Sequence, residues 1–113
     1  MKKEVEFDIG FADSAVSGYV VDNGNLTVRL IAWNGVKLSV SFHDFEGMAD
    51  YSAGDISSLV EFDGKNDFLS RVLQNVFEVP PAQTGLRLFQ FLNLDEEPSL
   101  EVVSPGIKIF RQG

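Results

Sequence analysis

The stretch that decides the fold is residues 25–43, which read NLTVRLIAWNGVKLSVSFH. Apolar and polar residues alternate along residues 26–33 and again along residues 36–43, and Asn34-Gly35 separates the two runs. Such alternation is typical of strands that bury one face, and an Asn-Gly step is typical of a tight turn between antiparallel strands. The stretch therefore predicts a β-hairpin on which the rest of the chain is built.

The requirement for one buried face decides the length of the hairpin loop. A two-residue loop would place Trp33 opposite Val36 and would mix apolar and polar residues on both faces. A three-residue loop, with Gly35 in the left-handed conformation of a bulge, instead places Leu30 opposite Leu38. The apolar residues that then share one face are Leu26, Val28, Leu30, Ala32, Val36, Leu38, Val40 and Phe42. This register predicts that Trp33 lies at the exposed tip of the hairpin.

Segments on both sides of the hairpin predict further strands. We expect them at residues 3–9, 15–21, 45–51, 86–94, 100–103 and 107–110. The first two of these segments and the two strands of the hairpin would form an antiparallel meander. Residues 86–94 are apolar on both faces, which is typical of an interior strand. Asp55 would cap a single helical turn that carries Ile56 and Leu59.

One helix is predicted at residues 67–78, where apolar side chains recur every three to four positions. Asn66 or Asp67 caps its start, and Pro80-Pro81 stop it. The apolar stripe of this helix, which includes Phe77, must pack against a sheet. We expect it to pack on the apolar face of the hairpin. Phe77→Asp should then be strongly destabilising, because it would bury an unpaired charge.

The predicted fold class is α+β. We expect one domain over residues 1–113, built mainly from an antiparallel sheet (a meander of about six to seven strands) with one amphipathic helix packed on one face. The chain is long enough to form its own core, and 44% of its residues are hydrophobic.

The amino-acid composition of the chain restricts the kinds of partner that it can bind. The chain carries 17 Asp and Glu against 9 Lys and Arg, and its net charge is −8. Phosphate contacts need clustered Lys and Arg, so this charge argues against nucleic acid and an anionic membrane surface and favours a basic protein as partner. Cysteine is absent, which excludes disulfides, thiolate metal sites and cysteine nucleophiles. Because no apolar segment follows the N-terminal Met-Lys-Lys, we expect a cytoplasmic protein.

The polar cluster nearest to a catalytic site is His43-Asp44, with Glu46 two residues further on. On a strand His43 and Asp44 would point to opposite faces and would not act as a unit. With one His and no Cys, a metal site would need oxygen ligands, and the sequence holds no EF-hand or phosphate-binding loop. We therefore predict no catalytic residues, no metal site and no cofactor.

Two parts of the chain resemble a known group of proteins. Residues 26–42 followed by Gly54-Asp55-Ile56-Ser57, and residues 86–95 running into residues 100–103, are similar to small acidic bacterial proteins of uncharacterised function. Some proteins of this kind are immunity proteins encoded beside secreted toxins. The resemblance rests on structural residues, so it assigns no functional residue; it implies a protein that neutralises a toxin.

Charge and the lack of site chemistry together predict a non-enzymatic acidic interaction domain that docks a basic protein. The candidate contact residues are the hairpin-tip Trp and the acids of two turns, namely Trp33, Asp44, Glu46, Asp95, Glu96 and Glu97. The structural alternative for Trp33 is to cover a neighbouring strand. Two further functions stay open: a homo-oligomer subunit that pairs through edge strands, and, ranked below it, a small ligand-binding or hydrolytic domain.

Overall fold

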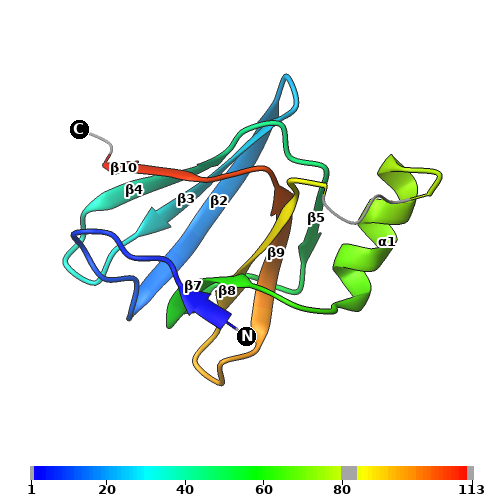
Figure 1. Cartoon of the computed structure of the whole chain (residues 1–113). Coiled ribbons are helices and arrows are strands. Elements are labelled where there is room, and N and C mark those ends of the chain that lie inside the picture. Colours follow the sequence, from blue (N-terminus) through cyan, green and yellow to red (C-terminus); the bar gives the residue numbers. More distant parts are fainter. Residues whose placement is uncertain (1, 80–83, 112–113) are drawn as a thin grey trace.

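Two five-stranded antiparallel sheets stack face to face in the computed structural model, which describes residues 2–79 and 84–111 (Figure 1). Sheet A contains, in spatial order, β1 (Lys2–Glu4), β7 (Ser58–Phe62), β8 (Arg87–Leu92), β9 (Pro98–Ser104) and β5 (Gly47–Asp50). Sheet B contains, in spatial order, β10 (Lys108–Arg111), β4 (Lys37–Phe42), β3 (Asn25–Ile31), β2 (Ser14–Asp22) and β6 (Asp55–Ile56). The helix of the described chain is α1 (Asp67–Val76).

The hairpin formed by β3 and β4 has the predicted register. Leu30 pairs with Leu38, so the apolar residues of the two strands share one face. The loop is closed by a hydrogen bond of 2.8 Å from the Ala32 N–H to the Val36 carbonyl oxygen. Gly35 has a φ of 83°, in the left-handed region where a side chain would be strained. The three-residue loop is confirmed.

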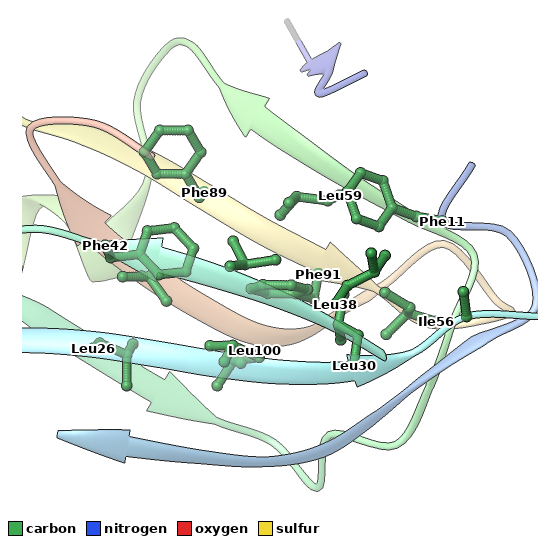
Figure 2. Close-up of a cluster of buried hydrophobic side chains, with 14 of the residues drawn as sticks. Phe11, Leu26, Leu30, Leu38, Phe42, Ile56, Leu59, Phe89, Phe91 and Leu100 are labelled. Carbon is green, nitrogen blue, oxygen red and sulfur yellow. The ribbon is translucent and has the colours of Figure 1, made fainter. Parts of the chain in front are cut away.

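The hydrophobic core lies between the two sheets, where the hairpin faces β8. Figure 2 shows Phe42 of β4 close to Phe89 and Phe91 of β8, with ring centroids 5.5 Å and 6.1 Å away. All three rings are fully buried, and each contributes about 1.5–3 kcal/mol by leaving water. The prediction that the helix covers the apolar face of the hairpin is therefore wrong, because sheet A occupies that face.

The helix covers the outer side of sheet A instead. Its one buried residue, Val72, packs on Leu88 of β8 and Val103 of β9. In Figure 1 the helix lies beyond β5 and β9, away from sheet B. The interior position of β8, predicted from its two apolar faces, is confirmed: one face meets the hairpin and the other meets the helix.

The start of the helix is predicted correctly and its end is not. Asn66 is the N-cap, and its side-chain oxygen accepts a hydrogen bond of 3.0 Å from the Leu69 N–H. The helix ends at Val76, since Phe77 is already extended. Phe77 is half-buried and outside the core, so a large destabilisation by Phe77→Asp is no longer expected. Pro80 and Pro81, the predicted stop, lie outside the described residues.

Other differences arise where a strand pairs with a partner distant in sequence. The first strand spans only Lys2–Glu4 and pairs with β7, not with β2. Asp55 and Ile56 form β6, which pairs with the start of β2 where a helical turn was expected. The α+β class and the antiparallel pairing are confirmed, but the described residues form ten strands, more than predicted. The pairing of β2 with β3 shifts between Val16 and Gly18, which places a bulge at Ser17.

Candidate functional site

The six candidate contact residues do not form one surface. Asp44 and Glu46 follow the end of β4, and Trp33 precedes its start, so a strand of 6 residues separates them, which corresponds to about 20 Å. Trp33 is at the exposed tip, as predicted, with 65% of its surface exposed. The turn after β8 lies at the Trp33 end. This follows because β9 runs from that turn to Ser104, whose hydroxyl donates a hydrogen bond to the His43 carbonyl oxygen at the opposite end.

The acidic turn between β8 and β9 is held by Asn93. The Asn93 side-chain oxygen accepts hydrogen bonds from the N–H groups of Asp95 at 2.9 Å and Glu97 at 3.1 Å. The Asn93 carbonyl oxygen accepts a third, of 2.9 Å, from the Glu96 N–H. The three acidic side chains are exposed. The turn thus presents its carboxylates from a fixed backbone.

At the other end, strand pairing adds a third acid to Asp44 and Glu46. The Asp44 N–H donates a hydrogen bond of 3.1 Å to the side-chain oxygen of Asn25. Asn25 pairs directly with Asp22 at the turn between β2 and β3. All three acids are exposed, and we call Asp22, Asp44 and Glu46 the acidic end. The sequence shows the turn at Asp22, but only strand pairing brings it beside Asp44.

His43 and Asp44 contact each other, although the strand pattern predicts that they point apart. Strand β4 ends at Phe42, and Asp44 has a φ of 52°, in the left-handed region. This turn of the backbone brings His43 Nε2 to 3.4 Å from Asp44 Oδ2. The His43 and Asp44 side chains are 75% and 69% exposed, so water screens the pair. They border a surface hollow of about 440 Å³ together with Ser41.

A buried polar cluster lies on the outer side of sheet A, which the sequence analysis missed. Glu101 of β9 accepts hydrogen bonds from the Gln90 side-chain amide at 2.8 Å and from the Tyr51 hydroxyl at 2.9 Å. Gln90 and Glu101 are almost fully buried, and Gln90 Oε1 has no hydrogen-bond partner among the described residues. Burial and the hydrogen bond to Glu101 raise the pKa of the Tyr51 hydroxyl above its usual value. The available signal was a polar residue in the middle of each of two interior strands.

A second tyrosine links sheet B to sheet A through a side-chain hydrogen bond. The Tyr19 hydroxyl of β2 donates a hydrogen bond of 2.9 Å to Asp50 Oδ2 of β5. The Asp50 carboxylate also accepts one of 2.8 Å from the Ala53 N–H. These bonds favour the ionised carboxylate, so the Ala53 N–H first and Tyr19 second lower the pKa of Asp50.

Among residues 2–79 and 84–111, no three His, Asp or Glu side chains gather closely enough to hold a metal ion. The helix within these ranges is too short to cross a membrane. The surface features described above are two acidic turns, an exposed Trp and the outer sides of the sheets. No protein family, curated protein or solved structure matches this chain.

Proposed function

We propose that this chain is a non-enzymatic protein-interaction domain that docks a basic protein on its acidic end, in the manner of an immunity or inhibitor protein. The observation that supports this most is the convergence of Asp22, Asp44 and Glu46 on one end. Their carboxylates come from segments far apart in sequence, and in the described chain only His43 brings a basic side chain within 4.0 Å of any of them.

Carboxylates placed at one end of the molecule by a fixed backbone suit the capture of a basic partner. Turns pinned by hydrogen bonds lose little conformational entropy on binding, which lowers the cost of association. A net charge of −8 steers a basic protein toward the surface before contact. The acids then set where the partner docks, and the sandwich behind them supplies a fixed frame.

The test compares the two acidic turns with equal changes of charge. One variant carries Asp22→Asn, Asp44→Asn and Glu46→Gln; the matched control carries Asp95→Asn, Glu96→Gln and Glu97→Gln. Asn suits position 44 because it tolerates the left-handed conformation. A basic protein would first be isolated with the tagged wild-type chain from its native cells, identified and purified.

The association rate of that protein with each variant would then be measured at several salt concentrations. We expect the acidic-end variant to associate roughly tenfold more slowly at low salt, with a smaller loss for the control. Equal losses in both variants, or a rate insensitive to salt, would contradict docking at the acidic end. Circular dichroism of each variant checks that it is folded.

A further inference from the structure

The outer face of sheet B is uncovered by any described helix, since α1 lies on the other sheet (Figure 1). Residues paired directly across an antiparallel sheet point to the same side, so the register identifies the outward set. We call this set the open face. It consists of Val20, Thr27, Ser41 and Lys108 in one row, Gly18, Arg29, Ser39 and Phe110 in the next, and Ala15, Ile31 and Lys37 in a third.

The open face is basic although the protein is acidic. Arg29, Lys37 and Lys108 are exposed, and none of them forms an ion pair with a described acid. The nearest acids occupy its two ends: Asp55 pairs with Ala15 at one end, and at the other Asp22 pairs with Asn25 and Asp44 lines the same hollow as Ser41 and Lys108. Standard sheet spacings put Asp55 and Asp22 roughly 12–14 Å from Arg29. That exceeds the Debye length of about 8 Å at physiological salt, so the face keeps a local positive potential.

Exposed apolar side chains stand beside these cations. Val20, Ile31 and Phe110 are 46%, 42% and 49% exposed. Between Arg29 and Phe110 lies Ser39, which is 1% exposed despite pointing outward, so longer side chains close over it. The result is a floor of short residues with a rim that is both apolar and cationic. Arg29 and Lys37 also line a hollow of about 260 Å³.

We propose that the open face binds an extended acidic peptide that carries a carboxylate at every second position, so that its carboxylates all face the sheet. Arg29 is paired with Ser39, which makes Lys37 its diagonal neighbour, and such neighbours lie about 7–8 Å apart. Side chains on one side of an extended peptide recur at about 6.8 Å. Two carboxylates two residues apart therefore match Arg29 and Lys37, and the Arg29 guanidinium can hold one of them with two hydrogen bonds.

The same charges argue against other occupants. A second copy placed face to face would set Arg29, Lys37 and Lys108 against their own equivalents, which repel each other. A long polyanion such as nucleic acid would extend over Asp22 and Asp55 at the two ends of the face. A short acidic segment meets the cations and avoids both ends.

The probe is a capped hexapeptide of alternating glutamate and valine, with the alternating glutamine and valine peptide as its neutral counterpart. Binding is followed by amide chemical shifts of the full chain. We expect the acidic peptide to shift resonances of β3, β4 and β10. Arg29→Gln/Lys37→Gln should weaken binding at least fivefold, and Lys2→Gln/Lys65→Gln, which removes two cations outside the face, should leave it unchanged.

Unchanged spectra, shifts confined to other surfaces, or equal binding of the neutral peptide would overturn the proposal. So would equal losses in the two double variants. The variant spectra themselves show whether the fold is intact. Because this test uses an acidic probe and the acidic end is tested with a basic protein, each proposal can fail without the other.

Discussion

At the scale of single residues, the cluster of Gln90, Glu101 and Tyr51 is notable because burying its polar groups costs free energy. The Glu101 carboxylate is buried on the outer side of sheet A with two hydrogen bonds, and Gln90 Oε1 beside it has none within the described part of the chain. Burying an unpaired acceptor costs about 1–3 kcal/mol. The cluster therefore specifies how β8 and β9 are aligned more than it adds to stability.

Gln90 and Glu101 should therefore be strongly coupled in their effects on stability. Gln90→Met removes the amide donor from a carboxylate that stays buried, and Glu101→Met leaves the amide without its acceptor. Each single change should lower the free energy of unfolding by about 1–3 kcal/mol. The double variant should lose less than the sum, because no unpaired polar partner remains.

Urea unfolding of the four proteins measures this cycle. Tyr51→Phe is the control, because Tyr51 is 50% exposed and water can reach the cluster from its side; its effect should be within about 1 kcal/mol. Additive costs for Gln90→Met and Glu101→Met would show that the two side chains do not act as a pair.

Residue-level expectations succeeded where the local pattern decides the outcome. The left-handed Gly35 and the exposed Trp33 follow from alternation and loop length alone. The contact between His43 and Asp44 was missed, since it depends on a left-handed Asp44 that alternation does not reveal. Lys108 and Arg29 share the open face only through pairing of β10 with β4 and of β4 with β3.

At the scale of elements, the packing of the helix against sheet A depends on a glycine. A Cβ built on Gly47 of β5 would lie 2.6 Å from Val72 Cγ2, closer than such atoms approach. The absence of a side chain at position 47 lets the helix settle on Leu88 and Val103. Close approach of an element to a strand is a common reason for glycine within that strand.

We expect Gly47→Ala to lower the free energy of unfolding by about 1–3 kcal/mol, because the helix must shift or Val72 must leave its rotamer. Gly54→Ala is the matched control, since a Cβ there meets nothing within 4 Å, and its effect should be within about 0.5 kcal/mol. Adding Val72→Ala should recover part of the Gly47→Ala loss. Chemical denaturation followed by circular dichroism measures each change. If Gly47→Ala leaves the free energy of unfolding unchanged, the packing of the helix does not depend on this glycine.

The helix itself could be predicted from the sequence, but the surface on which it packs could not. A stripe of apolar residues says that a helix must be covered, but not by what. Two apolar surfaces were available: the inner face of the hairpin and the outer face of β8. The two apolar faces of β8 were the clue, because a strand of that kind must be covered on both sides.

At the scale of the molecule, the sheets share one core and should unfold together. Pairs such as β1 with β7 and β4 with β10 join segments far apart in the chain. These pairs turned the predicted single sheet into a sandwich. A pattern of period two shows that a strand has an apolar face but does not name the strand it pairs with, so this level of the fold was beyond the sequence.

Hydrogen exchange tests the unity of the two sheets. Val28 in β3 and Phe91 in β8 lie in interior strands of different sheets, and both are fully buried. Their amides should open with free energies within about 1 kcal/mol of each other, while amides of α1 should exchange faster. A clearly weaker sheet B would mean that the sheets unfold separately.

The bulge at Ser17 blunts an edge that would otherwise recruit other chains. Beyond β6, strand β2 has no further neighbour among the described strands, and its Tyr19, Val20 and Val21 are exposed. A straight edge of this composition is a template for aggregation. The bulge bends the strand, and the Tyr19 hydrogen bond holds the Asp50 carboxylate beside it. Strand β2, which borders the open face, therefore also carries the features that protect the protein from aggregation.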